Sequence, residues 1–164
     1  MSTARRMTGH LSVDLRPGEA FQLFTPRGEQ DWSHGWHPHF PTSVDDDTKP
    51  GVVFETHGHG RPTIWLVTEC ETGLRIAYAR VTPGHLAGTV TVAISSRGAA
   101  SDVEVTYQLT ALASAADDEL SEFADGYPAY LHSWHDAIAA LLRRRRTEQA
   151  AMVAGNPASE PSHT

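Results

Sequence analysis

Residues 127–142 read YPAYLHSWHDAIAALL, and the arrangement of the whole chain can be inferred from this segment. Its large apolar side chains recur every three or four residues, which is the spacing of one face of an α-helix. They are Tyr127, Tyr130, Trp134, Ile138, Leu141 and Leu142. The pattern predicts a helix from about residue 126 to about residue 148, roughly 30 Å long, with Pro128 in its first turn. Such a helix must bury its apolar stripe against another large apolar surface.

The chain before this helix supplies that surface as a series of strands. Five segments with alternating or short apolar runs are separated by turn residues. They are residues 52–56, 63–69, 74–81, 88–95 and 102–110. The connections between these segments are too short for a parallel crossover, which predicts that neighbouring strands are antiparallel.

The N-terminal part adds one more strand and two short helices. Leu11, Val13 and Leu15 alternate with polar residues, which predicts a strand with one buried face. Residues 19–24 and 29–32 follow as short helical segments, residues 33–50 as an irregular loop, and residues 117–124 as a further short helix. The order of elements predicts an α+β fold. In it, a curved antiparallel sheet of about six strands wraps around the long C-terminal helix, with two short helices after the first strand.

Length and composition fit one globular domain. The chain has 164 residues, of which 40% are hydrophobic, and this size is ordinary for a single domain. We expect a flexible N-terminus over residues 1–7, a domain over residues 8–146 and a disordered tail over residues 147–164, because the tail turns to small and polar residues.

The net charge and the single cysteine indicate which classes of binding partner and which cellular compartment to expect. The net charge of -7 argues against a nucleic-acid surface, and the basic residues 143–146 suit the end of a helix. No apolar run is long enough for a membrane-spanning helix or a signal peptide. Cys70 is the only cysteine, which fits a reducing compartment. We therefore expect a cytoplasmic protein.

Several segments of the chain form a recognisable set: residues 20–29 (AFQLFTPRGE) with Trp32 and residues 35–36 (GW), residues 78–84 (YARVTPG), residues 105–112 (VTYQLTAL), Trp134 and Ile138. Taken together, they resemble the bacterial activator-of-Hsp90-homologue and polyketide cyclase-like branches of the START/Bet v 1-like (SRPBCC) superfamily. The resemblance covers residues from about 8 to 146 and contains no catalytic signature. It implies a helix-grip fold with a cavity between the sheet and the last helix. Members bind lipids, sterols, plant hormones or polyketides, and a minority catalyse cyclisation.

Aromatic side chains with polar tips are suited to line such a cavity. The candidate ligand-binding residues are Trp65, Tyr78, Tyr107, Phe123, Tyr127, Tyr130 and Trp134, together with Arg80. Arg80 continues the face of Ile76 and Tyr78, so an inward orientation would place a cation where it anchors a carboxylate or phenolate. The alternative for the rings is that they fill the core completely, and for Arg80 that it extends to solvent.

The histidines and the cysteine give little support to metal binding or nucleophilic catalysis. The chain has ten histidines, including groups at 34–39, 57–59 and 132–135, but no His-Glu-x-x-His motif. It also has no Gly-x-Ser-x-Gly motif. We predict no metal site and no cofactor. His85 follows Pro83-Gly84 and is either an acid or base at the rim of the cavity or a solvated loop residue.

These observations predict that a monomer or homodimer binds a small hydrophobic or aromatic ligand between the sheet and the C-terminal helix. One alternative is a polyketide cyclase/aromatase-like enzyme that uses tyrosine or histidine as acid and base, with Arg80 as the anion anchor. A second alternative is a co-chaperone-like protein-interaction module, which requires an exposed apolar patch outside the cavity.

Overall fold

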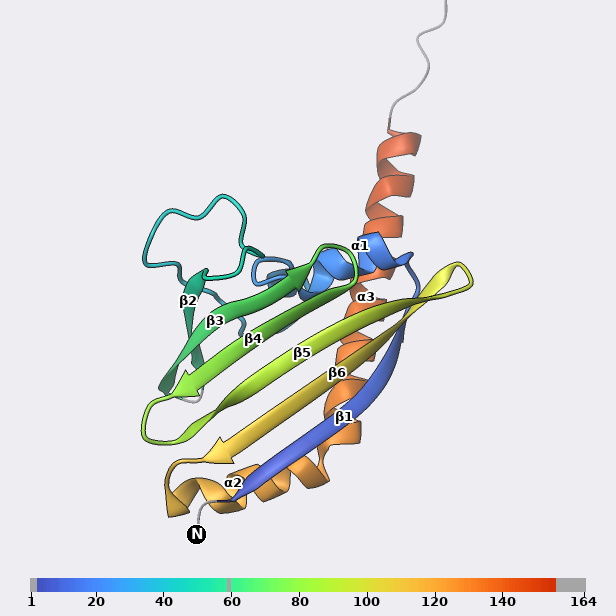
Figure 1. Ribbon diagram of the computed structural model, residues 1–164. Coiled ribbons are helices and arrows are strands. Elements are labelled where there is room, and N and C mark those ends of the chain that lie inside the picture. The colour runs from blue at the N-terminus through green and yellow to red at the C-terminus, as the bar shows by residue number, and fades with distance from the viewer. Residues whose placement is uncertain (1–2, 59, 156–164) are drawn as a thin grey trace, which may run out of the picture.

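The computed structural model describes residues 3–58 and 60–155 as a curved sheet wrapped around a long helix (Figure 1). All neighbouring strands are antiparallel, and the order across the six-stranded sheet is β1-β6-β5-β4-β3-β2. The strands are β1 (Ala4–Val13), β2 (Val53–Gly58), β3 (Arg61–Glu71), β4 (Arg75–Thr82), β5 (Leu86–Arg97) and β6 (Ala100–Ala111). The predicted α+β helix-grip fold is confirmed.

The helices lie at the ends and on one face of this sheet. After β1 come α1 (Pro17–Phe21) and the single 3₁₀ turns η1 (Gln22–Phe24) and η2 (Gly28–Asp31). After β6, α2 (Ser114–Asp125) leads into α3 (Tyr127–Ala154), and Gly126 separates the two. Pro128 lies in the first turn of α3, where a missing N–H costs no intrahelical bond. Within the described ranges every helix is too short or too polar to span a bilayer.

Both ends of the folded part extend further than expected. β1 begins at Ala4, which pairs with Thr110, so it includes part of the segment expected to be flexible. It also ends at Val13 rather than Leu15, and its polar first half has little alternation to reveal it. α3 continues to Ala154 through part of the expected tail, because residues 148–152 are good helix formers. Residues 1–2 and 156–164 lie outside the described residues.

The core lies between the inner face of the sheet and α3. On β5 the side chains of Val90, Val92 and Ile94 are buried, and their neighbours alternate to the outside. Leu131 and Ile138 of α3 are buried against this face. The remaining members of the predicted stripe on α3 are buried as well, except for Tyr130, which is half-buried.

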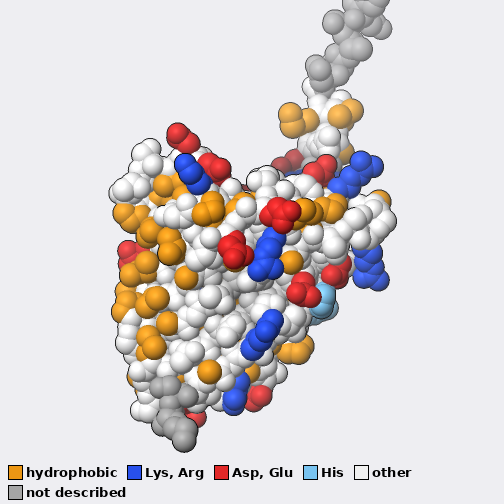
Figure 2. Space-filling model, in the orientation of Figure 1, with side chains coloured by type: hydrophobic (Ala, Val, Ile, Leu, Met, Phe, Trp, Pro, Cys, Tyr) orange, Lys and Arg blue, Asp and Glu red, His pale blue; other side chains and the backbone are white. Residues whose placement is uncertain are grey.

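The outer face of the sheet carries an apolar group over β2, β3 and β4. Val53, Ile64, Leu66 and Val81 are all exposed. The register places Val53 opposite Leu66 and Ile64 opposite Val81, so the four side chains form two cross-strand pairs. Figure 2 shows hydrophobic side chains gathered on the part of this face where β2, β3 and β4 lie.

Gly88 allows the close approach of β5 and β6 to be tested. A Cβ atom added there would lie 1.9 Å from the carbonyl oxygen of Gln108 on β6, so β5 and β6 would have to separate. We expect Gly88→Ala to lower the free energy of unfolding by about 1–3 kcal/mol, measured by urea denaturation. The matched control is Gly18→Ala, where an added Cβ meets no heavy atom within 4 Å. An equal effect in both variants would contradict the close approach of β5 and β6.

Candidate functional site

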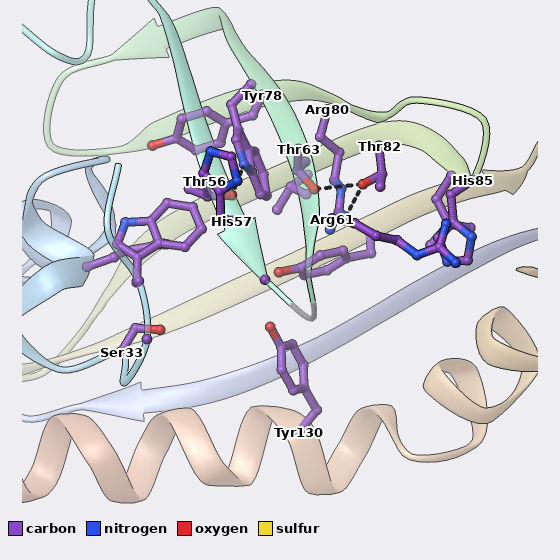
Figure 3. Close-up of a pocket in the computed structure, with 18 of the residues that line it drawn as sticks. Ser33, Thr56, His57, Arg61, Thr63, Tyr78, Arg80, Thr82, His85 and Tyr130 are labelled. Atoms are coloured by element: carbon purple, nitrogen blue, oxygen red, sulfur yellow. Dashed lines mark hydrogen bonds between the residues drawn. The ribbon is translucent and has the colours of Figure 1, made fainter. Parts of the chain in front are cut away.

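A cavity of about 290 Å³ opens between the inner face of β3–β6 and the N-terminal half of α3 (Figure 3). The η2 segment and the loop after it close one side, and the β4–β5 turn with α2 closes another. Its walls combine aromatic rings, two valines and a set of polar groups. The polar and charged side chains that line it are Glu29, Ser33, Thr56, His57, Arg61, Thr63, Arg80, Thr82, His85 and Glu119.

Two groups of aromatic rings face each other across this space. On one side Trp65 stacks on Phe54 with ring centres 5.8 Å apart, and Trp36 packs edge-on against Trp65 at 5.3 Å. On the other side Tyr130 contacts Trp134 at 5.3 Å. Rings of both groups line the cavity, including Trp36 and Trp65 on one side and Tyr130 and Trp134 on the other. The aromatic residues therefore frame an open space and do not fill it.

The structure brings most of the candidate residues together. Trp65, Tyr78, Tyr107, Tyr130, Trp134 and Arg80 line the cavity. Phe123 and Tyr127 do not line it. Phe123 packs against the rings of Tyr107 and Tyr130 from α2, at 5.3 and 5.1 Å. The Tyr127 hydroxyl donates a hydrogen bond to the Val105 carbonyl, which directs this ring to the sheet. Both residues support the wall from behind.

Arg80 points from β4 into the cavity, toward the side from which Tyr130 rises (Figure 3). Its guanidinium carbon lies 5.0 Å from the centre of the Trp65 ring, within the range of a cation–π contact. One terminal nitrogen donates a long hydrogen bond of 3.4 Å to the Thr82 hydroxyl. The Nε atom is buried and has no partner within the described part of the chain. Of the two orientations considered for Arg80, into the cavity or out to solvent, the structure has the first.

Glu29, at the η2 turn, contributes a carboxyl group that the sequence did not single out. The residue is half-buried, and the removal of water from its carboxyl group raises the pKa from 4.5 to about 8. At pH 7 this group is therefore largely neutral. A glutamate in a single 3₁₀ turn produces no periodic pattern, so nothing in the local sequence marks it as a cavity residue.

The tyrosine hydroxyls in the cavity are held in the neutral form. Burial raises the pKa of Tyr78, Tyr107 and Tyr130 above the ordinary value of 10, and the negative charge of Glu29 adds to this when it is ionised. The Tyr78 hydroxyl donates to the Phe24 carbonyl at 3.0 Å, which fixes the ring. All three hydroxyls therefore keep their protons at neutral pH, and that of Tyr78 is already donated to Phe24.

A hydrogen bond joins two elements at the rim of the cavity. His85, in the β4–β5 turn, is buried and hydrogen-bonded through Nε2 to the Glu119 carboxylate of α2. This contact joins two elements at the rim, so His85 is not simply a solvated loop residue. Deeper in, the hydroxyls of Thr63 and Thr82 are 2.7 Å apart, and the Trp65 indole donates to Thr56 at 2.9 Å. These bonds fix the polar groups along β2–β4.

The other histidines among the described residues lie away from this cavity or at its mouth. His34, His37 and His39 are exposed in the loop after η2. His57 lies at the mouth near the β2–β3 turn, while His59 lies outside the described residues. Ligand atoms of His132, His135 and Asp136 come within 4.8 Å of one another on the exposed side of α3. This is the one group of three such residues in the part of the chain that the structure describes.

No family model and no curated protein matches the chain, but solved structures do. CalU16 from Micromonospora echinospora aligns with a TM-score of 0.61 at 19% identity, over 85% of this chain and 75% of its own. Norcoclaurine synthase from Thalictrum flavum, solved with dopamine and hydroxybenzaldehyde, gives 0.59 at 11% identity, over 87% and 88%. The Aha1 dimer from Colwellia psychrerythraea gives 0.56 at 13% identity, over 82% and 96%.

These likenesses concern the fold. The chain has the helix-grip fold of Bet v 1-like, SRPBCC-type proteins, and the resemblance noted from its motifs is confirmed at that level. Proteins with this fold differ in function, so the function of this chain must be argued from its own cavity.

Proposed function

We propose that the protein binds a small aromatic ligand in the cavity between the sheet and α3. The observation that carries this proposal is the open space of about 290 Å³ between two walls of aromatic rings. Its volume is close to the lower end of known ligand pockets, roughly 300 Å³. The fold is also compatible with such ligands, since norcoclaurine synthase holds dopamine and hydroxybenzaldehyde. The predicted residues Trp65, Tyr78, Tyr107 and Trp134 would contact the ring of the ligand.

The residue Val90 offers a test of this proposal. It is buried on β5 and lines the cavity, so Val90→Phe would place a ring in the space. We expect wild-type protein to bind 2-naphthoate or 2-naphthalenemethanol with a Kd of about 1 mM or tighter, from a contribution of roughly 0.3 kcal/mol per ligand atom. Ligand-observed NMR titration measures this. Val90→Phe should weaken binding at least tenfold.

The matched control is Thr89→Phe, which adds the same ring at the neighbouring position on the outer face. It should leave the affinity unchanged. Wild-type protein that binds neither probe, or equal binding by Val90→Phe and wild type, would overturn the proposal. Circular dichroism establishes that both variants are folded.

A second candidate, the cyclase/aromatase-like enzyme, is favoured by the titratable groups in the cavity. Glu29 has a pKa near that of an efficient general base at neutral pH, and Arg80 provides a cation for a developing enolate. In this reaction the Glu29 carboxylate removes a proton from carbon next to a carbonyl, and the electron pair moves to the carbonyl oxygen. The acid–base group would then be Glu29, in addition to the tyrosines or histidine expected from the sequence.

This candidate predicts turnover, which simple binding does not. We expect wild-type protein to accelerate exchange of the α-protons of 2-tetralone for deuterium in D₂O, followed by NMR. The rate should rise as the pH increases through about 8, because only the ionised Glu29 is a base. Glu29→Gln should remove the acceleration. Exchange at the uncatalysed rate in wild-type protein would leave binding as the function.

A protein-interaction role, a cytoplasmic location, and a monomeric or homodimeric state also stay predictions. The apolar group of Val53, Ile64, Leu66 and Val81 is the feature in favour of the interaction role. The Aha1 structure of this fold is a dimer.

A further inference from the structure

The geometry points to an aromatic monoanion as the ligand, a carboxylate or phenolate whose charged group binds at Arg80 while its ring lies between the aromatic walls. This inference rests on the proposed function, because it names the class of molecule that the same cavity takes. It goes further by assigning a negative charge to the ligand and by naming Arg80 as the residue that binds the charged group.

The hydrogen bonding of Arg80 is incomplete. A guanidinium group has five N–H donors in a rigid fork. Within residues 3–58 and 60–155 only Nη2 donates to a protein acceptor, over 3.4 Å to Thr82, and the buried Nε has none. Buried donors in native proteins are almost always satisfied. A carboxylate that accepts from two adjacent N–H groups of Arg80 would supply the missing acceptors.

The charge of Arg80 is also uncompensated at neutral pH. No carboxylate oxygen in the described part of the chain lies within 4.0 Å of its guanidinium nitrogens. Of the two carboxyl groups that line the cavity, Glu119 is hydrogen-bonded to His85 at the rim, and Glu29 is largely protonated. Two guanidinium groups, those of Arg61 and Arg80, line the same cavity, so it presents a net positive charge to what enters it. This favours an anion over a neutral molecule of the same shape.

The aromatic residues around Arg80 favour an anion that carries an aromatic ring. The guanidinium lies on the face of Trp65, and Tyr107 and Tyr130 belong to the opposite wall. Burial raises the pKa of both tyrosines above its ordinary value, so their hydroxyls face the cavity in the neutral form. Val90 and Val92 line the apolar remainder of the space.

The test compares two probes that differ in charge, 2-naphthoate and 2-naphthalenemethanol, by ligand-observed NMR at pH 7. We expect wild-type protein to bind 2-naphthoate at least tenfold more tightly. Arg80→Met, which keeps a chain of similar length over Trp65, should abolish this preference and leave binding of the alcohol within twofold. Arg80→Lys should retain part of the preference, because it keeps the charge and loses the fork.

Arg75→Met is the matched control, since Arg75 lies on the same strand with its side chain exposed, 3.5 Å from Glu69. It removes the same charge from the protein and should leave the preference intact. Equal affinity of wild-type protein for both probes would overturn the inference while the proposed function stands. A preference that persists in Arg80→Met would assign the charge recognition to another group. Failure of both probes to bind would remove the proposed function itself.

Discussion

Replacing Phe54 by alanine is expected to lower the free energy of unfolding by about 3–5 kcal/mol, which corresponds to a fall in Tm of roughly 6–20 °C. Phe54 lies on β2 at the edge of the sheet, yet its side chain is fully buried. It stacks on Trp65 at 5.8 Å and contacts Tyr78 at 6.1 Å. Its loss would leave a void behind one wall of the cavity. Thermal and urea denaturation measure the effect.

The neighbouring residue Val53 provides the control. Its side chain belongs to the same strand but points outward and is 41% exposed. Val53→Ala should change the free energy of unfolding by no more than about 0.5 kcal/mol, as is usual at the surface. A similar loss in both variants would show that β2 is not anchored through its inner face.

Glu29→Gln is expected to stabilise the protein at pH 8 and above, and to have no effect near pH 4.5. The pKa of Glu29 is about 8 in the folded protein and 4.5 ordinarily. Between these values the unfolded chain has released the proton and the folded protein still holds it. The folded state of wild-type protein therefore loses stability as the pH rises through this window. Above pH 8 the loss is complete and constant.

The size of this effect follows from the same values. The interval from 4.5 to about 8 sets an upper bound of about 5 kcal/mol, and partial exposure of Glu29 reduces it to on the order of 2 kcal/mol. Glutamine has a similar shape and no charge, so the difference between the two stability–pH curves isolates this group. Urea denaturation at intervals from pH 4.5 to 9 measures it.

The control for this comparison is Glu19→Gln, an exposed glutamate on α1 close in sequence. Its stability–pH curve should follow that of the wild type. A constant offset between Glu29→Gln and wild type at every pH would contradict the buried carboxyl group, because a packing effect does not vary with protonation.

The fold could be predicted because its main elements have strong periodic patterns. The side chains of Val90, Val92 and Ile94 alternate, and the stripe from Tyr127 to Leu142 recurs at helical spacing. The first half of β1 could not be predicted, since it is defined by pairing with β6 rather than by its own residues. Pairing of this kind depends on residues about a hundred positions away.

The cavity could be predicted only in part. Arg80 shares a strand face with Ile76 and Tyr78, so the alternation of side chains along a strand is enough to predict that it points inward. Glu29 reaches the same space from a 3₁₀ turn, and only tertiary structure brings it there. Tyr127 and Phe123 are aromatic residues near Tyr130 in the sequence, so nothing local distinguishes them from it. The rotation of each helix about its axis directs Tyr127 to the sheet and places Phe123 behind the Tyr130 ring. Whether rings fill a space or frame it depends on summed volumes that no local pattern encodes.

The placement of the indole rings has an optical consequence. All four tryptophans of the chain belong to the two walls: Trp36, Trp65 and Trp134 line the cavity, and Trp32 packs against Trp134 with ring centres 5.2 Å apart. Indole emission depends on the polarity and the quenching groups around the ring. The ultraviolet fluorescence of the unlabelled protein should therefore respond to an occupant of this space, without background from indoles elsewhere.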